Sequence, residues 1–462
     1  MAETIRPQAE PLPELTRDRS FWAMTVTQFL GAFNDNLFKQ LVLLFCVDLA
    51  LQDRSQNLQG VATVVFSAPF ILFSGFGGFL SDRNSKKTIV VLCKVAEIVV
   101  MFLGVLAFKL GSLPVLMTVL FLMGSQSAFF GPAKYGILPE MVRERDLPRA
   151  NGIILMTTFL AIIFGFAIAG YIKEVFQANL WMACLTCIAI AALGTGTSLL
   201  IRRTPVAQPG LRFDPSALLV NRHTIRLLRR DRDLLVVLIV YSLFWFIAGV
   251  IYPPAINDLG KLQLRVGDSL TGQLAACTGV GIAIGCVAAG RLSRGRVRAD
   301  LIRWGLWGMF VCLVLLAWPS GRPDATLLSQ AGARVGGWLS ELPGLGRVAQ
   351  VVPPNLWGPG AALIAMGTFA GVFSVPMQVF LQAQAPEEQK GRIIGAMNLV
   401  NWVGIALSGV FYSLANLVLT RLDIPPNGMF GAAALLLLPV AFLYQPRDVD
   451  LSHLTHSAPA TR

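Results

Sequence analysis

The sequence predicts an all-α membrane protein with twelve transmembrane helices, arranged in two pseudo-symmetric halves of six helices each. Hydrophobic residues make up 55% of the 462 residues and charged residues only 14%, whereas a soluble protein is about a quarter charged. Apolar runs of about 20 residues, long enough to cross a bilayer, recur along the whole chain. The two halves also repeat their glycine spacings, which is typical of secondary transporters.

The apolar runs end where charges, Gly or Pro accumulate, and this pattern predicts the spans in order. In the first half they cover residues 21–50, 60–81, 88–109, 113–134, 151–173 and 179–201. In the second half they cover residues 233–256, 270–291, 300–318, 357–381, 392–419 and 428–445. Pro253 and Pro254 are expected to interrupt the seventh span at its outer end, because proline removes a helical N–H.

The spans divide the chain into five segments. Residues 21–201 and 233–445 form the two halves, an arginine-rich linker at 202–232 joins them, and residues 1–20 and 446–462 are tails. The second half contains an insertion at 319–355, in which apolar side chains recur at helical spacing and predict a short interfacial helix. These side chains are Leu327, Ala331, Val335, Trp338, Leu339 and Leu342.

The internal repeat is visible in the glycines. Those at positions 152, 165 and 170 in the fifth span and at 391, 404 and 409 in the eleventh are spaced 13 and 5 apart in both sets. The two glycine sets are 239 residues apart, whereas the similar segments that begin at Gly78 and Gly290, at the ends of the second and eighth spans, are only 212 apart. The insertion at 319–355 lies between these points in the second half and accounts for the difference. Glycines at such spacings also let neighbouring helices approach closely.

Basic residues are distributed unevenly between the two sides of the predicted bundle. Of the 38 Lys and Arg, 26 lie in the tails and in the connections on their side, nine lie on the opposite side, and three lie within spans or at their ends. By the positive-inside rule, both termini are expected in the cytoplasm, with the bundle in a bacterial inner membrane. The net charge of +12 therefore indicates orientation and contact with anionic membrane lipids, and no nucleic-acid partner is expected.

The first span carries polar residues that a lipid-facing helix would exclude. Gln28, Asp35 and Lys39 share one helical face, and Asn34 and Asn36 flank the acid. An ionised side chain at mid-bilayer costs at least about 2.5–3.5 kcal/mol, so such groups normally face a protein interior or a wet cavity. Two interpretations are open: an Asp35–Lys39 pair that only helps packing, or a polar stripe that lines a translocation path.

The residues from Gly78 to Lys87, GFLSDRNSKK, resemble the loop 2–3 signature of the major facilitator superfamily. Ser85 stands where that signature usually has glycine. The resemblance implies the major facilitator fold, with helices 1, 4, 7 and 10 around a central cavity. It also implies gate roles for Asp82, Arg83 and Lys87. Without the resemblance, the stretch would be an ordinary positively charged cytoplasmic loop.

Two further stretches resemble signatures of bacterial lysophospholipid transporters within that superfamily. They are QFLGAFNDN at residues 28–36 and FGPAKYGILPE at residues 130–140, and SLFW at 242–245 is also similar. The resemblance implies a transporter that moves lysophospholipid, notably lysophosphatidylethanolamine, to the cytoplasmic leaflet for reacylation by a separate acyltransferase. It implies substrate or ion contacts for the polar residues of the first span and, in and beside the fourth, for Phe129, Lys134 and Tyr135.

Other bases and acids within the spans are also candidates for head-group binding. Lys94 and Glu97 lie three residues apart in the third span and form a second candidate pair. Lys134 could equally extend to the membrane surface. Some family members carry an arginine shortly after SLFW, whereas this chain has Ala248 to Tyr252, AGVIY. Phosphate recognition would therefore depend on Lys39, Lys94 or another base.

An alternative function on the same fold is proton- or sodium-coupled transport or export of a small amphipathic solute or drug. An enzyme is not expected, because no Asp follows His223, His453 or His456 by the five residues that an acyltransferase His-x4-Asp box requires. These histidines lie outside the spans, so no metal and no other cofactor is expected. All seven cysteines fall in apolar runs, which is typical of small buried hydrophobic residues. We expect a monomer.

Overall fold

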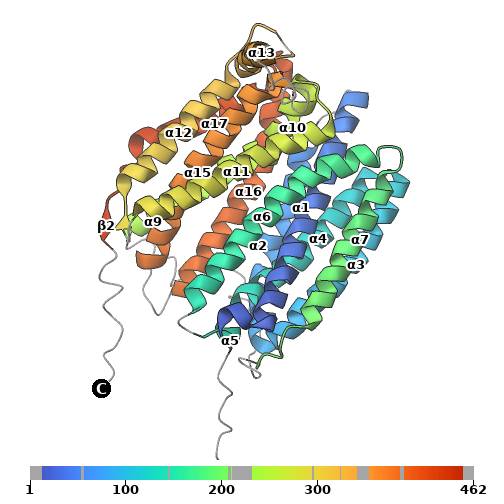
Figure 1. The fold of residues 1–462 in the computed structure, drawn as a ribbon, viewed down its shortest axis with the longest axis vertical. Coiled ribbons are helices and arrows are strands. Elements are labelled where there is room, and N and C mark those ends of the chain that lie inside the picture. Colours follow the sequence, from blue (N-terminus) through green and yellow to red (C-terminus); the bar gives the residue numbers. More distant parts are fainter. Residues whose placement is uncertain are drawn as a thin grey trace, which may run out of the picture.

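The computed structural model is a helical bundle elongated along its helix axes (Figure 1). It describes residues 13–53, 57–143, 146–206, 210, 231–293, 296–322, 324–340, 353–384 and 390–450. Most of the predicted linker 202–232, Leu342 of the insertion and both chain ends lie outside these residues. We call the end where α1 begins and α17 ends the terminal face, and the opposite end the far face.

All twelve predicted spans are found as helices. The helices of the first half are α1 (Arg19–Asp53), α2 (Gln59–Arg83), α3 (Lys86–Leu110), α4 (Leu113–Gly136), the short α5 (Leu138–Met141), α6 (Leu147–Val175) and α7 (Ala183–Leu199). Those of the second half are α9 (Arg232–Val250) with its continuation α10 (Ile256–Asp258), α11 (Asp268–Ser293), α12 (Ala299–Ala317), α13 (Leu327–Ser340) in the insertion, α15 (Trp357–Gln384), α16 (Lys390–Arg421) and α17 (Gly428–Leu443). Within the described residues, eleven helical segments are long and apolar enough to cross a membrane, and α17 is a shorter apolar helix.

The two prolines interrupt the seventh span with a kink, as predicted, but the span continues beyond its predicted end at residue 256. Tyr252 leaves helical geometry with φ −113° and ψ 113°, and wide π-helical turns at Ile251–Ala255 and Leu259–Gln263 flank α10. A proline lacks the N–H of a regular helix and its ring displaces the preceding turn. Wider turns absorb that displacement, so the span continues to Gln263 and brings Asn257 and Asp258 to the far face.

The glycine repeat predicted from the sequence has the same structural role in both halves. A Cβ on Gly165 would lie 2.9 Å from a carbonyl oxygen of α1, and one on Gly404 would lie 3.1 Å from a carbonyl oxygen of α9. Gly170 and Gly409 approach the other half instead, at 2.1 Å from a carbonyl oxygen of α11 and 2.4 Å from one of α2. The two halves thus meet along α6–α11 and α2–α16, as a pseudo-two-fold arrangement requires.

The insertion and the terminal face carry structure of their own outside the spans. In the insertion, the predicted helix is α13, which packs through Gly332 and Gly336 against Pro354 in the turn Pro354–Leu356. At the terminal face, β1 (Arg296–Val297) pairs antiparallel with β2 (Val449–Asp450). This short ladder ties the chain after α17 to the connection between α11 and α12.

The closest helix contact within the second half joins α11 and α15. A Cβ on Gly281 or Gly285 of α11, or on Gly367 or Gly371 of α15, would lie 2.0 to 2.6 Å from a carbonyl oxygen of the other helix. Real Cβ atoms do not approach that closely, so these positions exclude any side chain. Glycines four residues apart on both helices let the two backbones touch, which drives packing where the hydrophobic effect is absent.

We therefore expect Gly281→Ala to destabilise the bundle by about 1–3 kcal/mol, because overpacking forces the two helices apart. The measurement is the thermal unfolding midpoint in detergent. Gly290→Ala on the same helix is the matched control, since its Cβ would meet nothing within 4 Å. That control should be neutral or stabilising by up to about 1 kcal/mol, as alanine favours helix. Equal midpoints for the two variants would contradict the close contact.

Candidate functional site

Asp35 lies half-buried in the middle of α1 and is bound by two side chains of α4. Gln126 donates to one carboxylate oxygen through Nε2 at 3.1 Å, and the Ser127 hydroxyl donates to the other. Both partners are neutral. The sequence places Asp35 inside a span, but only the packing of α1 against α4 reveals these donors, because Gln126 lies 91 residues away.

Asp35 and Lys39 do not pair with each other in the described part of the chain, although their spacing allows it. The Lys39 ammonium instead lies 4.7 Å from the centre of the Phe66 ring on α2. Such a cation–π contact is worth about 0.5–2 kcal/mol but leaves the positive charge unneutralised. The packing interpretation of an Asp35–Lys39 pair is therefore not supported. Lys39 remains a base without a carboxylate partner among the described residues.

Lys94 and Glu97 form the ion pair that their spacing predicts, and it is fully buried. The ammonium lies 2.5 Å from one Glu97 oxygen, and Asn34 donates to the other oxygen at 2.7 Å. The Phe130 ring lies 5.0 Å from the ammonium. On α1, a Cβ on Gly31 would lie 2.2 Å from that ammonium, so glycine makes room for it. This pair joins α3 to α1 and α4.

Lys134 lies in the protein interior rather than at the membrane surface. It is only 8% exposed, and its ammonium reaches Thr158 of α6 at 3.3 Å. Thr158 in turn donates to Gln28 of α1 at 2.8 Å, and Gln28 donates to Thr157 at 2.6 Å. Three helices thus share one chain of hydrogen bonds, and Lys134 has no carboxylate partner within the described residues.

The remaining predicted residues have smaller roles. Asn36 donates to the carbonyl of Ala32 on its own helix at 2.7 Å. Phe129 stacks on Phe73 of α2 at 5.7 Å. Tyr135 is exposed and lies beside Lys134, with the ammonium 4.8 Å from its ring. Phe129 thus packs against α2, and Asn36 lies against α6, where a Cβ on Gly165 would be 3.0 Å from its Cβ.

Two buried amide oxygens in this interior lack a hydrogen-bond partner, namely Oδ1 of Asn34 and Oε1 of Gln126. Buried polar atoms are normally satisfied, so such atoms are free to bind water or a ligand. Among the described residues, three bases and two acids lie together in this interior: Lys39, Lys94, Lys134, Asp35 and Glu97. In their ionised forms, these five groups carry one excess positive charge.

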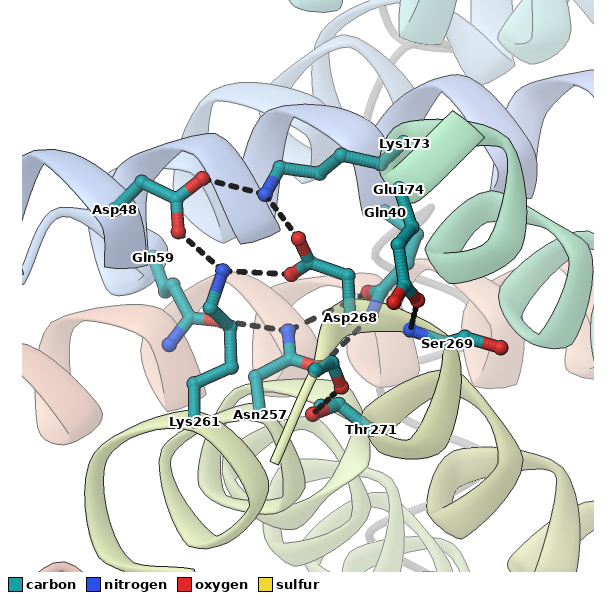
Figure 2. Close-up of polar contacts among 11 residues, drawn as sticks. Gln40, Asp48, Gln59, Lys173, Glu174, Asn257, Lys261, Asp268, Ser269 and Thr271 are labelled. Carbon is teal, nitrogen blue, oxygen red and sulfur yellow. Dashed lines mark hydrogen bonds and ion pairs between the residues drawn. The ribbon is translucent and has the colours of Figure 1, made fainter. Parts of the chain in front are cut away.

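A second cluster, at the far face, was not predicted from the sequence. Figure 2 shows four alternating charges, which we call the charge ring: Asp48, Lys173, Lys261 and Asp268. Each carboxylate binds both ammonium groups, and Lys173 and Lys261 each lie 2.6 Å from Asp268. These residues come from α1, α6, the end of the seventh span and α11. The ring therefore joins the two halves.

Beneath the charge ring, Asp258 of α10 receives only neutral donors in the described structure. The Tyr412 hydroxyl of α16 donates to one oxygen, while Asn57, just before α2, and Gln59, its first residue, donate to the other at 2.7 and 2.9 Å. Asn257 donates to Gln59 at 2.7 Å (Figure 2). This layer also crosses between the halves, so polar contacts close the far face. The charges of these residues near span ends are visible in the sequence, but the sequence does not indicate which of them contact each other.

The predicted gate residues lie at the terminal face. Asp82 is exposed, Arg83 lies 5.9 Å from the ring of Phe79 on its own helix, and Lys87 donates to the carbonyl of Leu199 at 3.0 Å. The buried ion pair of this loop is instead made by Lys86, with Glu140 of α5. Ser85 and the backbone N–H of Lys87 also contact the Thr204 hydroxyl, at 3.1 and 3.4 Å, so this loop is bound to the first half and to the start of the linker. The gate roles remain predictions.

We expect Lys94→Met to destabilise the protein by about 3–5 kcal/mol, because it leaves the Glu97 carboxylate buried and unpaired. The double variant Lys94→Met with Glu97→Gln should recover most of that loss, since a glutamine can still accept from Asn34. Thermal unfolding in detergent measures both. A single variant as stable as the unchanged protein would show that the pair is not ionised.

The chain matches known proteins over most of its length. The family model described as Major Facilitator Superfamily matches residues 21–409. A relative named lysophospholipid transporter LplT, from Pectobacterium carotovorum subsp. carotovorum, is 28% identical over 88% of this chain and 89% of its own. A protein of the same name from Yersinia pestis is 30% identical, over 59% of this chain and 64% of its own.

Solved structures show the same fold at low sequence identity. The nucleoside transporter NupG superposes with a TM-score of 0.67 at 11% identity, over 91% of this chain and 98% of its own. A bacterial homologue of the lysosomal transporter Spinster, in an inward-facing conformation, gives 0.59 at 13% identity, over 92% and 94%. With its twelve helices in two related halves and a family match across most of them, the chain belongs to the Major Facilitator Superfamily.

Proposed function

We propose that this protein is a secondary transporter that moves lysophospholipid across the bacterial inner membrane to the cytoplasmic leaflet by alternating access. Relatives at 27–28% identity over most of the chain are named lysophospholipid transporters. The observation that carries the proposal is the buried charged interior of the first half, with its excess positive charge and two unpartnered amide oxygens. Polar and charged groups inside a span normally face a substrate or ion path, which supports a transport role for this interior.

The groups of this interior suit a phospholipid head. Glu97 holds Lys94, which leaves Lys39 and Lys134 to bind a phosphate. Asp35 has only neutral partners, so its negative charge can bind the ammonium of an ethanolamine head. Lys39 and Lys134 would then replace the arginine that some relatives carry after the SLFW stretch.

The second half supplies an apolar counterpart for a single acyl chain. Aromatic side chains cluster on α9, where Phe244 lies 6.0 Å from Tyr241, 5.7 Å from Trp245 and 5.2 Å from Phe373 of α15, between ring centroids. Ligand sites of this kind are mostly apolar with a few polar groups that fix orientation. A head in the first half and a chain along the second would place the lysolipid between the two halves.

The charge distribution supports an orientation with the terminal face in the cytoplasm and the far face outside. The charge ring and the Asp258 layer then support an outer-closed state. Asp82, exposed at the terminal face, suits a gate that engages in the opposite state. We infer a monomer, whose product a separate acyltransferase would reacylate.

Uptake of labelled lysophosphatidylethanolamine into proteoliposomes tests this function directly. We expect the label to move from the outer to the inner leaflet only in vesicles that contain the protein, because the charged head crosses hydrocarbon too slowly alone. Leaflet distribution is read by back-extraction with albumin, with and without a proton gradient. Movement of an amphipathic drug but not of the lysolipid would contradict the proposal and favour the solute-transporter alternative.

Asp35→Asn should lower the initial uptake rate at least about tenfold, which corresponds to about 1.4 kcal/mol. The amide keeps the shape and can still accept from Gln126 or Ser127, but it cannot balance an ammonium. Folding should be unaffected, because Lys39 does not depend on Asp35. The matched control is Asp324→Asn, an exposed acid at the far face. Unchanged uptake in Asp35→Asn would exclude a head-group or ion-coupling role for this carboxylate.

A further inference from the structure

The charge ring at the far face has a particular division between the two halves. Asp48 and Lys173 belong to α1 and α6 of the first half, whereas Lys261 and Asp268 belong to the second half. The pairs Lys173–Asp48 and Lys261–Asp268 lie within one half each. The pairs Lys173–Asp268 and Lys261–Asp48 cross between the halves. Each half therefore brings one base and one acid, and is neutral on its own.

This division decides what happens when the halves separate. An ion pair made of one charge from each half would leave two unpaired charges when it broke, which is costly in a poorly hydrated site. Three of the four ring side chains are at most 12% exposed, and Asp48 is 30% exposed. In this ring, however, each ammonium already has a carboxylate of its own half as a partner, so separation of the halves would remove only the two crossing contacts.

The backbone beneath the ring makes the same crossing contact. A Cβ on Gly170 of α6 would lie 2.1 Å from the carbonyl oxygen of Asp268 in the first turn of α11. One turn further along each helix, a Cβ on Gly272 of α11 would lie 2.9 Å from the carbonyl oxygen of Ala167 of α6. The Glu174 carboxylate also accepts from the backbone N–H of Ser269 at 3.1 Å. The end of α6 thus packs directly against the start of α11, and the charge ring lies beside this contact.

We propose that the charge ring is a partner-exchange latch: it closes the far face through the two crossing ion pairs and opens by keeping one Lys–Asp pair within each half. This rests on the proposed alternating access, not on the identity of the substrate. The latch also fixes how the two halves are positioned when the far face is closed, because opposite charges face each other in only one relative placement of the halves. It also lets the far face open without exposing an unmatched charge.

Exchanging the acid and base within one half tests this mechanism. Lys261→Asp with Asp268→Lys keeps a pair inside the second half but turns both crossing contacts into repulsion. Asp48→Lys with Lys173→Asp does the same in the first half. The quadruple variant restores attraction at every contact of the ring. Spin labels at Ala178→Cys and Arg421→Cys, exposed at the far face in different halves, report the separation once the seven native cysteines are replaced by alanine.

We expect a short label distance for the unchanged ring, a shift of the dominant distance to longer values in each double variant, and a return to the short distance in the quadruple variant. A double variant that keeps the short distance would overturn the latch. A quadruple variant that stays long would also overturn it, since the charges alone would not explain closure. A double variant that fails to fold would contradict the claim that each half satisfies its own charges.

The distances are measured without substrate, so the result does not depend on lysolipid uptake. Failure of uptake in proteoliposomes combined with the expected distances would leave the latch standing and remove only the substrate. Normal uptake combined with unchanged label distances in all variants would support the proposed substrate and overturn the latch. The two proposals can therefore fail separately.

Discussion

A charge carried into the helical bundle must be satisfied by the protein or by a bound ligand, because hydrocarbon offers neither hydrogen bonds nor counter-ions. For the two acids of the central interior, the structure draws the partners from different helices. Glu97 is held by Lys94 of its own helix and by Asn34 of α1, and Asp35 is held by two donors of α4. The arrangement of α1, α3 and α4 is therefore tied to the polar groups between them.

Glycine makes these polar contacts possible. Gly31 leaves space for the Lys94 ammonium, and Gly170 lets α6 reach the first turn of α11 beside Asp268. In an apolar solvent, helices gain little by burying large side chains against each other, and close backbone approach takes over that role. The same residues thus bring the helices together and bring the charged groups within bonding distance.

The two halves share a fold but divide the chemistry. The first half holds the bases and acids of the central interior, whereas aromatic side chains cluster in both halves, on α2 and α4 in the first and on α9 in the second. At the far face the division is even, with one acid and one base of the charge ring from each half. Charged groups confined to one side of the interior suit an amphipathic ligand. An equal share of charges at the far face suits two surfaces that repeatedly associate and separate.

The sequence by itself determined the number of helices, the repeat of the two halves and the presence of charged groups inside the first and third spans. These follow from hydropathy, glycine spacing and residue positions along one helix, which are local properties. The Lys94–Glu97 pair was predictable for the same reason, since its members are three residues apart. Only the tertiary structure decided that Asp35 binds α4 rather than Lys39, that the seventh span extends beyond residue 256 to Gln263, and that Asp48 meets Lys261. Those outcomes depend on which helices pack together, and the partners lie far apart in the chain.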